Sequence, residues 1–318
     1  MRTLRILLCV PALVLWMTSA AQRQVEDAND DWLFSYKEAT AKPVKGIPPQ
    51  AQVGYDDAGW KSVSVPHTWQ TYETTGELHP FIASPHAKDN PYWWDGKGFY
   101  RKHFTLRPGM RGRKLFIEFD GVMKNCLAYM NGKLIGEHLG GYGCFYFELT
   151  DYVDCDGDNL FVLEVSNRQT DPQRVPPMDA GCWNFYGGIY RNVRLVATDD
   201  VFIPFQGSYK HEGGTHVTTE NLSDSVSRVR VRTWVRNERA ERQAVELTTA
   251  IVDGDGRVVA AASAPQEIRP QETALYDEEF EIAGPKRWSP ASPDLYKVVS
   301  TVTAGGRTCD RYETVFGI

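Results

Sequence analysis

The sequence predicts an all-β protein built from two successive sandwiches. Short stretches of alternating apolar and polar residues recur along the chain, and clusters of turn-forming residues separate them. Between residues 31 and 198 no segment keeps a long apolar period of 3.6 residues, so the helical crossovers of a parallel sheet are not expected. The length of 318 residues favours two domains, because single domains usually hold about 100 to 200 residues.

The N-terminus has the order of features typical of a secretory signal. Arg2 and Arg5 precede an apolar run at 6–17, and small residues follow at 19–21. The apolar run is too short to span a bilayer comfortably. We therefore expect residues 1–21 to be a signal peptide and the mature chain to be secreted or periplasmic, with no membrane partner after cleavage.

The first sandwich is predicted over residues 22–198. Residues 114–119 alternate, with apolar side chains at 115, 117 and 119 on one face. Asn131-Gly132 separates two short apolar runs, and this dipeptide favours a tight β-hairpin turn. Residues 160–166 form another half-buried strand pattern. Antiparallel strands joined by such turns are typical of a sandwich.

The second sandwich is predicted over residues 199–318. Residues 228–235 alternate cleanly, and the arginines at 228, 230 and 232 are expected on a solvated face, not in a binding patch. Similar patterns at 245–251 and 296–302 are followed by glycine-containing turns. About seven short strands in this part of the chain indicate an immunoglobulin-like sandwich.

Composition and motifs exclude several classes of function. The net charge of −6 and the lack of a basic stripe argue against a nucleic-acid partner. No zinc-ligand spacing, phosphate loop or dinucleotide fingerprint occurs, so no metal and no cofactor are expected. His211 and His216 are expected in a solvated loop. Of the six cysteines, cleavage of the signal would remove Cys9, and the odd remainder favours buried free thiols over a disulfide framework.

Two aromatic clusters beside glycines are the strongest candidates for binding. One lies at 92–94, and the other comprises Trp183, Phe185 and Tyr186. Flat rings can stack on the C–H faces of sugars, and turns at the rim of a sandwich collect binding residues. Most of these rings are nevertheless expected to fill a core.

The order of several motifs resembles glycoside hydrolase family 2, in particular its β-galactosidase branch. The matching segments are YDDAGWKSVSVPHTW at 55–69, GKGFYRKHF at 96–104, FDGVMKNCLAYMNGKLIGEHLGGYGCFYFELT at 119–150, NFYGGIYRNV at 184–193, RWSPASPDLY at 287–296 and RYETVFGI at 311–318. The resemblance implies a galactose-binding-like jelly-roll sandwich followed by an immunoglobulin-like β-sandwich. It also implies that catalysis belongs to a later α/β barrel carrying two glutamates.

The resemblance also implies where this chain would touch sugar. In β-galactosidases an aspartate of the first domain often reaches the sugar site, and this sequence has Cys182 at that position. The implied sugar-binding candidates are Asp179, Cys182, Trp183, Asn184 and Tyr186. A structural role in closing the jelly roll is the alternative for this segment.

No catalytic residue is expected in this chain. Retaining glycosidases need two carboxylates about 5 to 5.5 Å apart, and none of the acidic residues follows a strand of a β/α pattern. Asn237-Glu238 resembles the Asn-Glu of the family's barrels, but we expect it to be an exposed turn between strands.

Two hypotheses for function follow. The first is the non-catalytic N-terminal part of a secreted β-galactosidase-like enzyme, whose partners would be a β-galactoside-like carbohydrate and a catalytic barrel in cis or in trans. The second is a free-standing carbohydrate-binding or interaction module. Assembly into a homo-oligomer stays open in either case.

Overall fold

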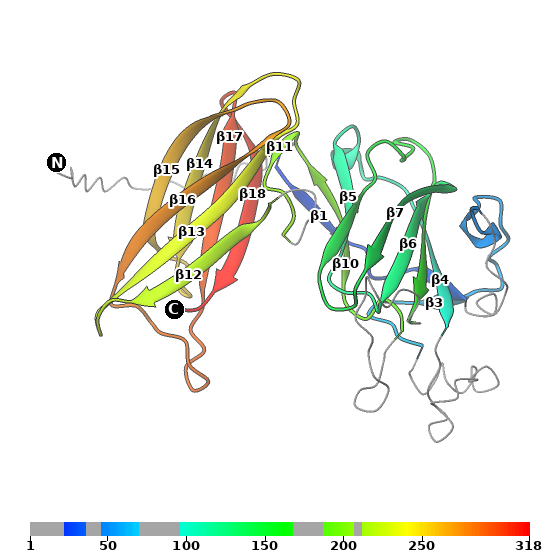
Figure 1. Cartoon of the computed structure of the whole chain (residues 1–318), viewed down its shortest axis with the longest axis horizontal. Coiled ribbons are helices and arrows are strands. Elements are labelled where there is room, and N and C mark those ends of the chain that lie inside the picture. The colour runs from blue at the N-terminus through cyan, green and yellow to red at the C-terminus, as the bar shows by residue number, and fades with distance from the viewer. Residues whose placement is uncertain (1–21, 36–45, 70–95, 168–186, 207–211) are drawn as a thin grey trace.

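The computed structural model describes residues 22–35, 46–69, 96–167, 187–206 and 212–318. The chain forms two β-sandwiches side by side, joined by a connection near residues 199–206 (Figure 1). The predicted all-β class, a jelly roll followed by an immunoglobulin-like sandwich, is confirmed. The expected signal peptide lies outside the described residues. Within the described ranges, no helix has the length and apolar character needed to cross a membrane.

The first sandwich packs a four-stranded sheet against a six-stranded sheet, counted over the described residues. The four-stranded sheet has the order β1-β10-β5-β8, with β1 Gln24–Asp27, β10 Val193–Thr198, β5 Lys114–Phe119 and β8 Phe145–Glu148. The six-stranded sheet has the order β3-β2-β4-β9-β6-β7, with β3 Lys61–Val63, β2 Trp32–Ser35, β4 Lys97–Phe104, β9 Asn159–Ser166, β6 Asn125–Met130 and β7 Lys133–Leu139. Short 3-10 turns lie at Pro49–Ala51 (η2) and Pro108–Met110 (η5).

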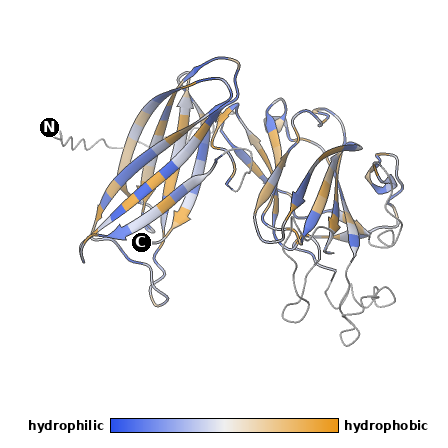
Figure 2. Cartoon of the chain, viewed as in Figure 1, coloured by the Kyte–Doolittle hydropathy of each residue, from blue (hydrophilic) through white to orange (hydrophobic). Residues whose placement is uncertain are grey.

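Apolar faces of the two sheets meet in one core. Trp32 has no exposed surface, and its ring makes edge contacts with Tyr100 and Phe161, both with ring centroids 6.2 Å away. Burying each such side chain contributes about 2 to 3 kcal/mol. Figure 2 shows the hydropathy alternation along these strands. The predicted hairpin is confirmed, because Asn131 (φ 49°) and Gly132 (φ 78°) both take the left-handed conformation that this turn requires.

The second sandwich contains the predicted immunoglobulin-like strands. In one sheet β13 Val226–Asn237 pairs on one side with β16 Glu272–Ala283, and on the other with β11 Val201–Phe202 and β12 Thr215–Asn221. The other sheet has the order β15-β14-β17-β18, with β15 Val258–Ile268, β14 Gln243–Val252, β17 Tyr296–Ala304 and β18 Arg307–Phe316.

The structure tests two predictions made for polar residues of this domain. The arginine face of β13 is solvated and carries ion pairs, as between Arg230 and Asp277 with an N–O distance of 2.6 Å. The loop prediction for His216 is wrong, because His216 lies in β12 and its ring packs edge-on against Trp234. His211 lies outside the described residues. The polar composition of this segment concealed an edge strand, whose side chains do not need to be apolar.

An arginine near the start of the described chain joins the two sandwiches. The Arg23 side chain donates from Nε and Nη2 to the carboxylate of Asp310 in β18, at 3.0 and 2.8 Å, and from Nη2 to the backbone oxygen of Ile203. Its guanidinium lies between the rings of Phe205 and Tyr312, 5.3 and 5.0 Å from their centroids. The Arg23 and Asp310 side chains are 6% and 0% exposed, so this ion pair is sealed between the domains.

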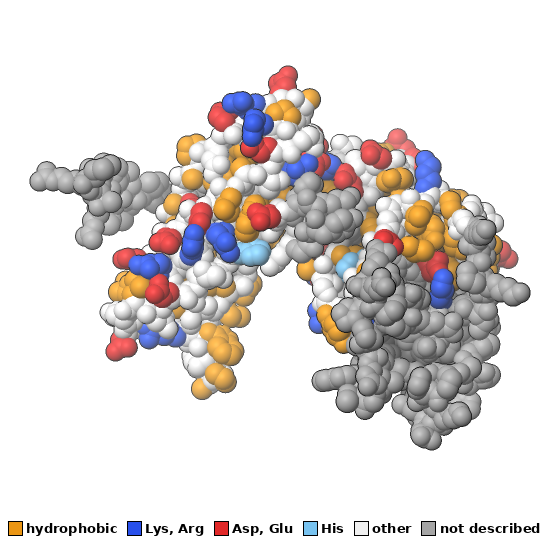
Figure 3. Space-filling model, in the orientation of Figure 1, with side chains coloured by type: hydrophobic (Ala, Val, Ile, Leu, Met, Phe, Trp, Pro, Cys, Tyr) orange, Lys and Arg blue, Asp and Glu red, His pale blue; other side chains and the backbone are white. Residues whose placement is uncertain are grey.

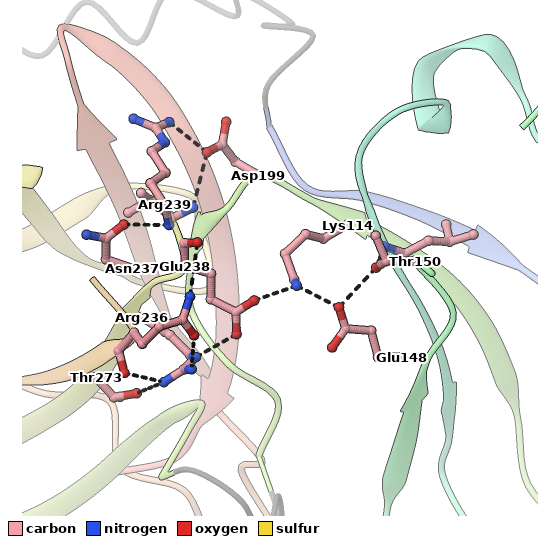
Figure 4. A network of polar contacts seen from close by, with 12 residues as sticks. Lys114, Glu148, Thr150, Asp199, Arg236, Asn237, Glu238, Arg239 and Thr273 are labelled. Atoms are coloured by element: carbon pink, nitrogen blue, oxygen red, sulfur yellow. Dashed lines mark hydrogen bonds and ion pairs between the residues drawn. The ribbon is translucent and has the colours of Figure 1, made fainter. Parts of the chain in front are cut away.

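A second polar network crosses the same seam (Figure 4). Lys114 of β5 pairs with Glu148 of β8 and with Glu238, which follows β13, at 2.6 and 2.5 Å. Burial acts to raise the pKa of Glu238, but hydrogen bonds from Lys114 and Arg236 hold that pKa below its usual value. The network ties the first sandwich to the end of β13.

The exposed-turn interpretation of Asn237-Glu238 is therefore wrong. Asn237 is fully buried and donates to the backbone oxygens of Glu241 and Ile268, and Glu238 is half-buried at the seam. Glu238 joins the two domains through Lys114, whereas the partners of the Asn237 side chain lie within the second sandwich.

The cysteines fit the predicted free thiols only in part. Cys126 and Cys309 are free and buried, whereas Cys144 and Cys155 are free and half-buried. Burial raises the pKa of the Cys309 thiol, which disfavours the reactive thiolate form. Cys182 lies outside the described residues.

Candidate functional site

The predicted sugar-binding residues all fall in one segment that the structure does not describe. Asp179, Cys182, Trp183, Asn184 and Tyr186 lie within 168–186, outside the described residues. The aromatic cluster at 92–94 lies in another such segment, 70–95. The described residues on either side of both segments do show where these parts of the chain are attached.

The attachment points of the two segments meet at one end of the jelly roll. The backbone N–H of Trp69 donates to the oxygen of Gly187 at 3.2 Å, and that of Asn167 donates to the oxygen of Gly96 at 3.2 Å. The Asn167 side chain also accepts a hydrogen bond from the N–H of Gly96 at 2.7 Å. The described residues that flank the two segments thus meet at the same end of the first sandwich, although about 90 residues separate the two aromatic clusters in sequence.

Two glycines fix the chain where it re-enters the sandwich. A Cβ atom on Gly187 would lie 1.9 Å from the indole of Trp69, so only glycine fits against that ring. Gly188 has a φ of 120°, and a Cβ there would lie 2.4 Å from the hydroxyl of Tyr100. Backbone hydrogen bonds of 3.0 and 3.1 Å pair Gly188 with Met123 in both directions. Gly187 and Gly188 therefore hold the chain against Trp69, Tyr100 and Met123 at the point where it re-enters the jelly roll.

A buried aromatic wall lies directly beneath these glycines. The Phe34 and Trp69 rings are stacked with centroids 6.0 Å apart, and Nδ1 of His67 shares a hydrogen bond of 2.7 Å with the Tyr100 hydroxyl. Burial lowers the pKa of His67 to about 4, with a smaller effect from Lys61, and burial raises the pKa of Tyr100. Both groups are neutral at pH 7, so these packed rings carry no charge.

A glycine-rich loop forms the described rim of the same end. Tyr142 stands between Gly141 and Gly143 with 64% of its surface exposed. The Tyr190 hydroxyl donates to the backbone oxygen of Gly141, and the guanidinium of Arg191 lies 5.3 Å from the centroid of the Tyr190 ring. An exposed ring on a fixed loop is suited to stack on a sugar face. The G-G-Y motif contained this signal, but sequence reasoning used it only for the resemblance.

Acidic residues come together near this end without forming a free catalytic pair. Glu118 and Asp120 both accept from Arg194, with N–O distances of 3.2 and 2.6 Å for the closest atoms. Burial raises the pKa of Glu118, against the opposing effect of Arg194. The shared guanidinium pairs with both carboxylates and balances one of their two charges, so neither is placed as an unpaired nucleophile. Among the described residues no group of histidine, cysteine and acidic side chains could hold a metal ion.

Comparison with known proteins gives the class of this molecule. The model described as "Glycosyl hydrolases family 2, sugar binding domain" matches residues 25–199, and that described as "Glycosyl hydrolases family 2" matches residues 214–318. These matches cover most of the chain, which therefore belongs to glycosyl hydrolase family 2.

Individual relatives share both domains. A β-glucuronidase of Formosa agariphila is 33% identical over 94% of this chain and 30% of that protein, and a β-galactosidase of Bacteroides ovatus is 28% identical over 93% of this chain and 32% of that protein. The crystal structure of Bacteroides uniformis β-glucuronidase superimposes with a TM-score of 0.76 and 28% identity, over 93% of this chain and 32% of that one. The chain thus spans about a third of the length of these relatives.

Proposed function

We propose that this chain is the non-catalytic N-terminal part of a secreted β-glycosidase that hydrolyses terminal β-linked sugars such as β-galactosides. Its role is to scaffold a catalytic α/β barrel, in cis or in trans, and to form one wall of the sugar site. The relatives named β-galactosidase and β-glucuronidase are both consistent with this substrate class. The basic, apolar and small-residue order of the first 21 residues supports secretion or export to the periplasm.

One observation carries the proposal. The glycine-anchored end of the jelly roll collects the attachment points of both aromatic segments and presents Tyr142, whereas Glu118 and Asp120 near it both pair with Arg194. Such an end can bind and orient a sugar, but these two described carboxylates are not placed as the separate acid and nucleophile that glycoside hydrolysis requires. The bond-breaking groups would then come from the catalytic domain.

An activity assay on the purified chain tests the proposal. We expect no release of nitrophenol from p-nitrophenyl β-galactoside or β-glucuronide above the buffer rate. We also expect activity from a chimaera in which residues 22–318 replace the matched part of Bacteroides uniformis β-glucuronidase. Turnover by the chain alone, or an inactive chimaera beside an active parent enzyme, would contradict the proposed role.

A further inference from the structure

The loop between β16 and β17 carries apolar side chains into solvent. Trp288 is 50% exposed and Leu295 is 46% exposed. Pro290, Ala291 and Pro293 between them are exposed as well. We name residues 288–295 the apolar knob; Figure 3 shows a group of hydrophobic side chains at the lower end of the second sandwich, where this loop lies in Figure 1.

The apolar knob is held in one conformation by its own polar groups. Ser289 and Ser292 exchange backbone hydrogen bonds of 2.8 and 3.1 Å, and the Ser292 hydroxyl donates to the carboxylate of Asp294 at 2.5 Å. Two prolines further restrict the backbone. Because the loop is already ordered, a partner that covers it would lose little affinity to the cost of ordering it.

The charged residues beside the apolar knob are directed away from it. Lys286 pairs with Asp255 at 3.0 Å, and the guanidinium of Arg287 donates to the backbone oxygen of Ser223. The exposed surface of the apolar knob therefore consists mainly of Trp288, Leu295, Ala291 and two prolines, and its one charged group, the Asp294 carboxylate, accepts a hydrogen bond from Ser292. This composition matches the core of a protein–protein interface, whereas a sugar would need free donors and acceptors around a ring.

The apolar knob packs against the residues that follow β18 and lies on the same side of the molecule as the attachment end of the jelly roll. The backbone N–H of Trp288 donates to the backbone oxygen of Ile318 at 2.7 Å. Gly317 packs so closely that a Cβ atom there would lie 2.9 Å from the Cβ atom of Trp288. In Figure 1 the loop that carries the apolar knob points to the lower side of the molecule, and the described strands of the jelly roll lead to its attachment end on that side too. One body on that side can contact both sandwiches.

We propose that the apolar knob is the docking surface for the catalytic domain of the enzyme, with Trp288 as its anchor. This inference rests on the proposed function. It adds that the second sandwich holds the catalytic domain by a preformed apolar contact, so that the jelly-roll end lies over the catalytic domain's sugar site.

Hydroxyl-radical footprinting of the isolated chain and of the chimaera tests this surface. Leu295 has a matched control in Leu275 of β16, because the two leucines are 46% and 40% exposed. Both leucines should be oxidised at similar rates in the isolated chain. In the chimaera we expect oxidation of Trp288 and Leu295 to fall roughly fivefold, as for side chains that enter the dry core of an interface, while that of Leu275 stays unchanged.

The outcomes separate the two proposals. An active chimaera with Trp288 and Leu295 protected supports docking. An active chimaera in which Leu295 is oxidised as fast as in the isolated chain overturns the docking surface and leaves the proposed function standing. An inactive or insoluble chimaera, prepared beside an active parent enzyme, overturns both.

Discussion

Replacement of Arg23 by alanine should loosen the joint between the two sandwiches. Arg23 belongs to the first sandwich and Asp310 to the second, so their ion pair stabilises the joint itself and neither domain alone. The Arg23→Ala substitution leaves the Asp310 carboxylate in place with none of its surface exposed. The perturbation therefore creates a buried charge that has lost its counterion.

The expected loss follows from what remains around Asp310. Removing one partner of a buried ion pair costs about 3 to 5 kcal/mol. Two backbone N–H groups, of Ile203 and Arg311, still donate to the carboxylate at 2.8 and 2.9 Å. They hold the loss near the lower end of that range, and we expect the free energy of unfolding to fall by about 3 kcal/mol.

Urea unfolding followed by circular dichroism and by tryptophan fluorescence measures this loss. A matched control is Arg107→Ala, because Arg107 pairs with Glu26 of β1 at 3.0 Å but its side chain is 72% exposed. The control should cost less than about 1 kcal/mol. We also expect the Arg23→Ala variant to unfold in two separate transitions. If Arg23→Ala costs no more than Arg107→Ala, the reasoning about the sealed ion pair is refuted.

Three further predictions test the jelly-roll end and the seam. Lowering the pH from 7.5 to 5.0 should reduce the free energy of unfolding by about 2 kcal/mol through His67, because His67 takes up a proton near pH 6.5 in the unfolded chain but only near pH 4 in the folded chain. A His67→Gln variant should lose this part of the pH dependence of the urea midpoint, and an unchanged dependence would contradict the assignment. Gly187→Ala places a methyl group inside the volume of the Trp69 indole and should lower the free energy of unfolding by about 3 kcal/mol. In the control Gly143→Ala, the added methyl group would meet nothing within 4 Å, and the change should be less than about 0.5 kcal/mol. Equal unfolding midpoints would argue against the close packing at Gly187. Lys114→Met leaves two carboxylates without their shared ammonium group and should lower the free energy of unfolding by about 2 kcal/mol at pH 7. The control Lys297→Met removes an exposed ion pair and should lower it by less than about 0.5 kcal/mol. Similar losses in the two variants would speak against the seam network.

Local pattern predicted many of the strands and the Asn131-Gly132 hairpin, but it missed the polar edge strand β12. Alternation at 114–119 placed Leu115 and Ile117 in the core, and both are fully buried. The Asn131-Gly132 turn was predictable because few dipeptides adopt two consecutive left-handed residues. These features depend on residues that are neighbours in sequence, so they can be predicted from a single sequence.

The seam could not be predicted in the same way. Its contacts join residues far apart in sequence, such as Lys114 with Glu238 and Arg23 with Asp310. Polar residues at such a joint look like solvated turns until their partners are known, and the interpretation of Asn237-Glu238 failed for this reason. Of the candidate sugar site, the segment at 179–186 lies outside the described residues but for its flanking glycines, and Tyr142 was overlooked although the glycines on either side of it indicate a turn.

The composition of the seam explains how two domains can act as one scaffold. Apolar rings at the seam supply contact area, because Phe205 packs against Phe116 and Tyr146 of the jelly roll with centroids 4.9 and 4.6 Å away. Apolar contact alone would tolerate sliding, since it has no direction. The ion pairs of Arg23 and Lys114 do have direction, and each tethers a strand of the first sandwich to the second. The jelly-roll end and the apolar knob are therefore held at a fixed separation on the same side of the molecule, which is the geometry that the proposed scaffolding role requires.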